Sequence, residues 1–334
     1  MQQTRSFRAK HEALYASDRD CVRYDEALCQ QQDHANALVQ AIRDVIPLLP
    51  HTHLADVGAG TGKLARRLAE HVGTIDIVDR SAEALSVART SFADRAVRLH
   101  QADLRALPLQ SGSVHLVVAG WAVSYLKSEN EVWHEDGSSS GPWRDEVDAA
   151  LREMDRVLAP GGTMIILETL GTATVTEQRS GSWLYAHYRA SGMQQRTVRT
   201  DYRFADKKTA LATLLFFFGK GVARRAQELL ANVADTGEAC IVPECTGMWW
   251  RHKAEGPSME CSRGQSEAID KTSWFASMTT GAAQSGSSTG RRSWWATSST
   301  SWLAPHGAAA GVSVALLACV AAGACLYALK RRET

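Results

Sequence analysis

Three glycines separated by single residues follow a short apolar run near the start of the chain. The stretch reads Asp56-Val57-Gly58-Ala59-Gly60-Thr61-Gly62, and a helical pattern begins directly after it. Glycine lets the backbone turn sharply and lets a ligand approach without a clash against Cβ. A strand, such a turn and a helix N-terminus predict an α/β sheet that binds a ligand at the carboxyl edge of its strands.

Strand-like and helix-like patterns alternate on both sides of this turn. We expect strands over 53–57, 75–78, 97–100, 114–119 and 163–167, and helices over 33–48, 62–72, 82–89 and 144–158. Two later strands are expected over 197–204 and 240–250, with helices near 207–218 and 222–233. Such alternation favours a parallel sheet with helices on both faces.

The glycine turn differs from the two common nucleotide-binding motifs. Dinucleotide enzymes use G-x-G-x-x-G, but here the third glycine comes one residue early and Lys63 stands where the longer motif wants glycine. No P-loop string occurs in the chain. Asp56 would repel a pyrophosphate, but it can bind the amino group of a cationic cofactor directly or through water.

Further acidic residues follow the next two strands. Asp79 ends the second strand and is followed by Arg80, and a carboxylate in this place can accept both hydroxyls of a ribose. Asp103 and Leu104 follow the third strand, where a carboxylate can accept a hydrogen bond from an adenine amino group.

With these motifs in this order, the chain resembles the class I S-adenosylmethionine-dependent methyltransferases over about residues 24–253. The resemblance implies a Rossmann-like α/β fold, whose seven-stranded, mostly parallel sheet has its last strand antiparallel. It also implies S-adenosyl-L-methionine as cofactor. The residues that it assigns to cofactor binding are Asp56, Gly58, Ala59, Gly60, Thr61, Gly62, Asp79, Arg80, Asp103 and Leu104.

Methyl transfer chiefly requires alignment of donor and acceptor, and a general base can assist it. We predict Tyr125 and His134 as the catalytic residues, with Glu168 and His187 as further candidates, because they follow the fourth and fifth strands. An aromatic acceptor pocket is expected from Trp121, Tyr185, Tyr188 and Tyr202.

Several other classes of function fit the sequence poorly. Lys plus Arg number 37 and Asp plus Glu number 36, so the basic excess typical of nucleic-acid binding is missing. The seven cysteines form no C-x-x-C pair, and His134-Glu135-Asp136 lacks metal-ligand spacing, so we expect no metal site. Ala119-Gly120-Trp121-Ala122 stands where base-modifying amino methyltransferases carry Asn/Asp-Pro-Pro-aromatic, and we expect no nucleic-acid partner.

The composition changes after a first domain, which we expect over residues 1–253. Residues 254–306 are rich in Ser, Thr and Gly and are expected to be a disordered linker, the alternative being an artefact of the gene model. Residues 307–329 carry no charge and are long enough for a transmembrane helix, although they could instead fold back onto the domain. A short basic tail, 330–334, follows. Gly307 and Gly311 form a G-x-x-x-G pattern, which permits a dimer through this helix.

The sequence thus predicts an S-adenosylmethionine-dependent methyltransferase that acts on a small molecule, which could be lipophilic, at a membrane. The first thirty residues contain no apolar signal segment, so we expect a C-terminal anchor with the catalytic domain in the cytosol. Two alternatives stay open: a methyltransferase for protein side chains, and a catalytically silent scaffold that binds the cofactor.

Overall fold

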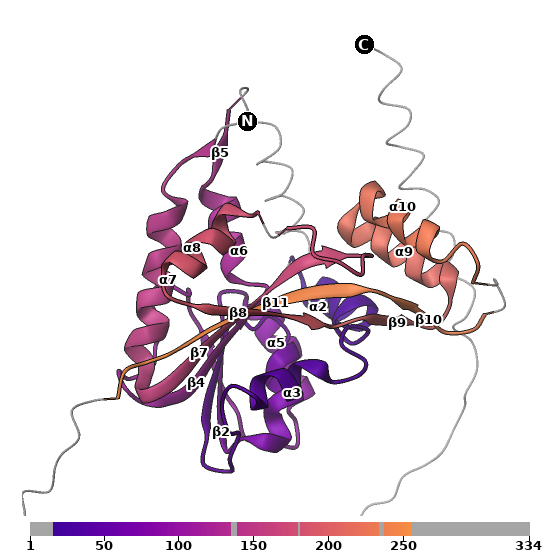
Figure 1. Cartoon of the computed structure of the whole chain (residues 1–334). Coiled ribbons are helices and arrows are strands. Elements are labelled where there is room, and N and C mark those ends of the chain that lie inside the picture. Colours follow the sequence, from indigo (N-terminus) through magenta and orange to yellow (C-terminus); the bar gives the residue numbers. More distant parts are fainter. Residues whose placement is uncertain (1–15, 135–138, 180, 234–236, 256–334) are drawn as a thin grey trace, which may run out of the picture. The chain divides into compact units, whose positions relative to one another are not determined.

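A seven-stranded sheet organises the protein in its computed structural model, which describes residues 16–134, 139–179, 181–233 and 237–255 (Figure 1). The strands lie in the order β3-β2-β1-β4-β7-β11-β8. Their bounds are β1 His53–Val57, β2 Thr74–Asp79, β3 Arg98–Gln101, β4 Val114–Gly120, β7 Leu158–Thr172, β8 Gln194–Arg199 and β11 Glu244–His252. Strands β1, β2, β3, β4 and β7 pair in parallel, whereas β11 is antiparallel to both β7 and β8. The mostly parallel sheet with an antiparallel last strand is therefore confirmed.

Helices cover both faces of this sheet, and each face has its own apolar core. On one face lie α3 Ala37–Arg43, α4 Lys63–Leu68, the short turn η2 Ala69–His71 and α5 Ala82–Ser91. On the other lie α6 Val123–Asn130, α7 Trp143–Val157 and α8 Trp183–Ala190. The central strands are buried on both sides, which explains why β1 and β4 read as continuous apolar runs.

A smaller group of elements has a core of its own. Strands β9 Tyr202–Phe204 and β10 Cys240–Val242 pair with each other, and helices α9 Lys207–Phe218 and α10 Lys220–Leu229 pack with them. The N-terminal segment comprises α2 Asp18–Tyr24 and the π-helical turn η1 Asp25–Cys29. A β-bridge joins Gln32 to Tyr202, and the Arg203 N–H donates to the Gln31 carbonyl at 2.9 Å. The N-terminal segment is thus tied directly to β9.

Most expected elements form, but β7 Leu158–Thr172 is much longer than the strand expected over 163–167, α3 Ala37–Arg43 is shorter than the helix expected over 33–48, and two expected strands are divided. The strand expected over 197–204 is divided into β8 and β9, because the Thr200 N–H bonds the Glu244 carbonyl while the chain leaves the main sheet. The strand expected over 240–250 is likewise divided into β10 and β11, on either side of Pro243. A hairpin, β5 Val132–Trp133 with β6 Ser139–Ser140, was not expected.

The C-terminal predictions lie outside the residues that the structure describes. These predictions are most of the 254–306 linker, the 307–329 helix and the 330–334 tail. Within the described ranges, no helix combines the length and the apolar character needed to cross a bilayer.

Candidate functional site

A cavity of about 430 Å³ opens at the carboxyl edge of the sheet, beside β1, β2 and β4. The glycine turn forms its floor, and residues that follow β2, β3 and β4 form further walls. Helix α6 and the N-terminal segment complete it. Nine of the ten residues that the sequence assigned to cofactor binding line this cavity, namely Asp56, Gly58, Ala59, Gly60, Thr61, Asp79, Arg80, Asp103 and Leu104.

The glycine turn has a backbone that only glycine adopts without strain. Gly58, Gly60 and Gly62 have φ values of 65°, 55° and 82°. A Cβ on Gly58 would lie 2.5 Å from Cβ of Ala122, so the turn has no room for a side chain there. Gly62 does not line the cavity; it precedes α4, and a Cβ on it would lie 3.1 Å from the Phe92 ring.

Asp56 is a buried carboxylate beneath this turn. One oxygen accepts a 2.8 Å hydrogen bond from the Ala65 N–H in α4, and the other has no partner among the described residues. Burial raises the pKa of Asp56 to about 7. A buried carboxylate oxygen without a partner, in the wall of a cavity, is suited to meet a cation.

Asp79 and Asp103 line the cavity from the neighbouring strands. The Asp79 carboxylate accepts backbone N–H groups from Gly60 at 2.7 Å and Ser81 at 2.8 Å, which fixes its orientation. Its partial burial raises its pKa, although these hydrogen bonds offset part of the effect. Hydrogen bonds from Arg105, above all from its guanidinium, lower the pKa of Asp103 and keep it ionised.

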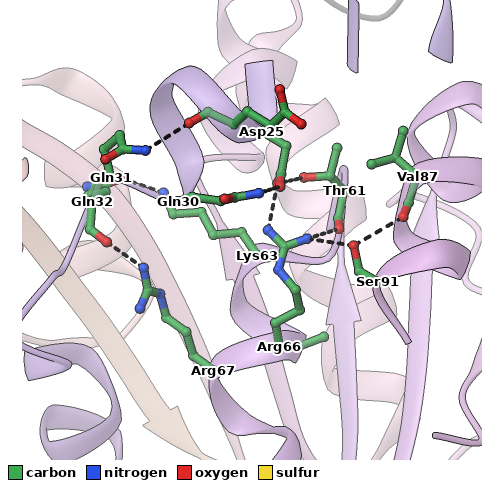
Figure 2. A network of polar contacts seen from close by, with 12 residues as sticks. Asp25, Gln30, Gln31, Gln32, Thr61, Lys63, Arg66, Arg67, Val87 and Ser91 are labelled. Carbon is green, nitrogen blue, oxygen red and sulfur yellow. Dashed lines mark hydrogen bonds and ion pairs between the residues drawn. The ribbon is translucent and has the colours of Figure 1, made fainter. Parts of the chain in front are cut away.

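A polar network fastens the N-terminal segment to the glycine turn (Figure 2). The Thr61 hydroxyl donates to Asp25 at 2.5 Å, and the Arg66 guanidinium pairs with the same carboxylate oxygen at 2.6 Å. Arg66 also donates to the Thr61 carbonyl at 2.7 Å. The other Asp25 oxygen accepts from the Gln30 amide at 2.8 Å. This network holds Tyr24 and Cys29, its neighbours in the chain, in the cavity wall.

The end of the cavity next to β4 differs in character from the part near Asp79 and Asp103. Trp121, which directly follows β4, has a left-handed φ of 53°, and the Lys63 ammonium lies 3.6 Å from the centre of its indole ring. Tyr24, Cys29 and Tyr125 line the same cavity. Burial raises the pKa of Tyr125 well above its usual range and the Glu168 charge adds to this, so the phenol keeps its proton at neutral pH. This opposes the base role expected for Tyr125.

Other expected site residues lie away from the cavity. His134 is exposed after β5, where its imidazole contacts the Ser140 hydroxyl at 2.8 Å. His187 pairs with Asp148 at 2.7 Å, and Glu168 accepts from the Ser124 N–H at 2.8 Å without lining the cavity. The structure therefore gives His134 no contact with the cofactor cavity, because the β5–β6 hairpin carries it outward.

Three of the four expected acceptor-pocket aromatics are core residues in the structure. Tyr185 and Tyr188 pack against Trp249 with ring centres 4.5 and 5.4 Å apart, and the Tyr185 hydroxyl donates to the Thr169 carbonyl. Tyr202 stacks on Phe204 in the small sheet. The described residues that line the cavity all lie between positions 24 and 129, so only Trp121 is where the sequence placed it.

Sequence reasoning missed the residues of the cavity that come from irregular or charged segments. Tyr24 and Cys29 belong to α2 and η1, which lack an apolar repeat. Lys63 and Glu129 are ordinary helix residues by pattern. The one signal that could have indicated Lys63 is its place directly after the glycine turn.

Fold and cavity together define a class of protein: a Rossmann-like enzyme that holds an adenosine-containing cofactor over its first strands. S-adenosylmethionine fits the residues present. The cradle at Gly58 admits no Cβ, the unpartnered Asp56 oxygen suits a cationic amino group, and Asp79 and Asp103 are spaced along successive strands.

Comparisons with known proteins agree with this assignment. The family model described as "Methyltransferase domain" matches residues 55–166. A protein named an uncharacterized methyltransferase, from Mycobacterium tuberculosis, is 27% identical over 163 residues, which are 49% of this chain and 72% of that protein. Malonyl-[acyl-carrier protein] O-methyltransferase of Halorhodospira halophila is 31% identical over 194 residues, 57% of this chain and 55% of that protein. Demethylmenaquinone methyltransferase of Chlamydia pneumoniae is 26% identical over 158 residues, 45% of this chain and 61% of that protein.

The chain carries a methyltransferase domain over residues 55–166, and the matching family model and relatives support a class I S-adenosylmethionine-dependent methyltransferase. It is an enzyme, and S-adenosyl-L-methionine is its cofactor.

Proposed function

We propose that this enzyme methylates a small molecule that enters the cavity at the end next to Trp121 and Tyr125. One observation carries the proposal: the carboxylates expected to bind the cofactor share a single cavity with this aromatic end. Its volume, about 430 Å³, is in the range of small-ligand sites. A wall built from Tyr24, Cys29 and α6 closes around a small acceptor more readily than around a folded protein.

The residues of the cavity would perform alignment rather than acid–base chemistry. S-adenosylmethionine supplies a methyl group on a positively charged sulfur. That methyl group would pass to an acceptor atom, with S-adenosylhomocysteine as the leaving group. Asp79 and Asp103 would fix the nucleoside, and Trp121 and Tyr125 would orient the acceptor. Alignment alone can contribute about 7–11 kcal/mol in favourable cases.

The relatives support a small or carrier-bound acceptor. One is named for malonyl-[acyl-carrier protein] and one for demethylmenaquinone, so the two names indicate acyl and quinone chemistry. The aromatic rings at the Trp121 end of the cavity would accept such a molecule, including a lipophilic one.

The test uses the full chain and S-adenosylmethionine that carries an isotopically labelled methyl group. Cell extract is divided into a small-molecule fraction and a protein fraction, and each is incubated with the enzyme and with Asp79→Asn as the impaired control. We expect enzyme-dependent label in the small-molecule fraction. Label confined to protein would favour the protein methyltransferase. If no S-adenosylhomocysteine forms with either fraction, the silent scaffold would be favoured.

We propose separately that residues 307–329 anchor the enzyme in a membrane, with the catalytic domain in the cytosol. Support comes from the sequence alone: 23 uncharged residues suffice to cross a hydrocarbon core of about 30 Å. Fractionation of the full chain beside a 1–306 truncation tests this. Release of the full chain by carbonate would disprove the anchor, and protection of the catalytic domain from protease in intact organelles would reverse the topology.

A further inference from the structure

Lys63 is a cation in the cavity wall whose direct contacts are an amide oxygen and an aromatic ring, while the Glu244 and Asp33 carboxylates act on it only at longer range. It is the first residue of α4, and its ammonium lies 3.6 Å from the centre of the Trp121 ring. The same ammonium donates a hydrogen bond to the Gln32 side-chain oxygen. In the described part of the chain, no carboxylate forms an ion pair with it.

The partner of Lys63 is rigidly held. Gln32 is 2% exposed, and its amide nitrogen donates to the Thr200 hydroxyl at 3.1 Å. The Arg67 guanidinium contacts the Gln32 backbone carbonyl (Figure 2). Because the amide nitrogen is already engaged, the amide oxygen is turned to the ammonium. The position of Lys63 is therefore built by the fold and does not depend on a flexible surface contact.

The two cations that follow Lys63 on α4 are bound to the structure of the protein itself. Arg66 pairs with Asp25, and Arg67 contacts the backbone near Gln32 and the Asn36 side chain. Lys63 alone of these three lines the cavity. Its burial lowers its pKa to about 8, so the ammonium form predominates at neutral pH but has lost part of its hydration. Partly buried charges of this kind are stabilised by an opposite charge.

Lys63 lies at the Trp121 end of the cavity. The ribose and adenine positions inferred from Asp79 and Asp103 follow β2 and β3, whereas Trp121 follows β4 and Gln32 bridges to Tyr202 in β9. In the sheet order β3-β2-β1-β4, the indole–ammonium pair is on the opposite side of β1 from both carboxylates.

We propose that Lys63 binds a carboxylate at this end of the cavity. The proposal rests on the function proposed above and names a substrate class for it, because a carboxylate there would belong to an acidic acceptor. The methionine part of the cofactor carries the same chemical group and is the other possible source, so the experiment must separate the two.

The experiment measures binding by calorimetry to the full-length wild type, Lys63→Met and Lys63→Arg. Arg224→Met, which removes an exposed cation on α10, is the control for net charge. S-adenosylhomocysteine is compared with 5′-methylthioadenosine, which has the same nucleoside and thioether but no amino acid. Hexanoate and benzoate are then titrated into protein saturated with S-adenosylhomocysteine, with 1-hexanol and benzyl alcohol as uncharged counterparts.

If the acceptor supplies the carboxylate, wild type binds the acids in preference to the alcohols. Lys63→Met then weakens acid binding about tenfold or more, and Lys63→Arg restores part of it, as expected for loss of a charge-assisted hydrogen bond. If the cofactor supplies the carboxylate, Lys63→Met weakens binding of S-adenosylhomocysteine by a similar factor and leaves the affinity for methylthioadenosine unchanged.

Two results would overturn the assignment. One is a Lys63→Met protein with wild-type affinity for every probe. The other is an equal loss for S-adenosylhomocysteine and methylthioadenosine, which would show a structural role only. Because these titrations need no turnover, they report on Lys63 even if the isotope experiment places the label on protein.

Discussion

The Asp25 carboxylate and the Arg66 guanidinium lie 2.6 Å apart and join the N-terminal π-helical turn to the helix that follows the glycine turn. Asp25 is 3% exposed, and it also accepts from Thr61 inside the glycine turn. One ion pair thus connects a wall of the cavity to the loop on which the cofactor is expected to rest.

Replacement of this carboxylate should affect both stability and cofactor binding. Asp25→Asn leaves Arg66 and the Thr61 hydroxyl without their charged partner, and we expect a loss of about 2–4 kcal/mol in the free energy of unfolding. Affinity for S-adenosylhomocysteine should fall in parallel. Denaturant titrations of Asp25→Asn, Arg66→Met and the double variant measure the coupling. Additive effects of the two single changes would show that the pair does not act as a unit.

Two glycines with nearly the same φ allow the effect of backbone strain to be distinguished from the effect of a steric clash. Gly58 and Gly112 have φ values of 65° and 67°. A Cβ on Gly58 would lie 2.5 Å from Cβ of Ala122, whereas a Cβ on Gly112 would have no atom within 4 Å among the described residues other than its chain neighbours. Gly112→Ala should cost about 1–2 kcal/mol of stability from strain alone and leave cofactor affinity unchanged. Gly58→Ala should cost more and weaken S-adenosylhomocysteine binding. Equal effects of the two changes on binding would argue against a cradle at Gly58.

Asp79 is expected to bind the ribose through its charge. Asp79→Asn retains the size of the side chain but loses charge-assisted hydrogen bonds, each worth about 1.5–3 kcal/mol, so affinity for S-adenosylhomocysteine should fall at least about tenfold. Asp94→Asn, a surface change after α5, is the matched control. Calorimetry with unchanged affinity for the Asp79 variant would refute the ribose assignment.

Acid sensitivity should arise in part from Asp76, at the far side of the sheet from the carboxyl edge. Burial alone would raise the pKa of Asp76, but hydrogen bonds from His53, Arg98 and His100 outweigh it and hold the pKa well below its usual range. A depressed carboxyl pKa contributes stability above the unfolded value of about 3.9, and this contribution is lost as the pH falls toward the folded value. Wild type should therefore exceed Asp76→Asn in stability at pH 7, and the difference should shrink below about pH 4. A difference that is constant from pH 7 to pH 3 would contradict this.

Local signals account for the parts of the fold and the site that could be predicted from sequence. Strand β1 and the turn up to Gly62 were predicted residue by residue, because a buried strand must be apolar and a left-handed turn favours glycine. Asp79 and Asp103 line the cavity because parallel strands end at one edge, which is a consequence of topology and not of tertiary detail.

The remaining parts depend on packing that no local pattern encodes. Tyr185 and Tyr188 looked like pocket residues, but an aromatic ring is equally suited to a core, and Trp249 covers both. The cavity wall instead comes from η1, a π-helical turn without a regular apolar repeat, whose position depends on the contact of Asp25 with Arg66.

The bridge between Gln32 and Tyr202 has a consequence for the order of events in catalysis. It joins the chain beside the cofactor cradle to the β9–β10 sheet, so this part of the cavity surroundings is tied in place before any acceptor binds. Because the proposed acceptor site is in the same cavity as the residues expected to bind the cofactor, a bound acceptor would obstruct the route of the nucleoside. Steady-state kinetics should accordingly be sequential, with S-adenosylmethionine first to bind and S-adenosylhomocysteine last to leave.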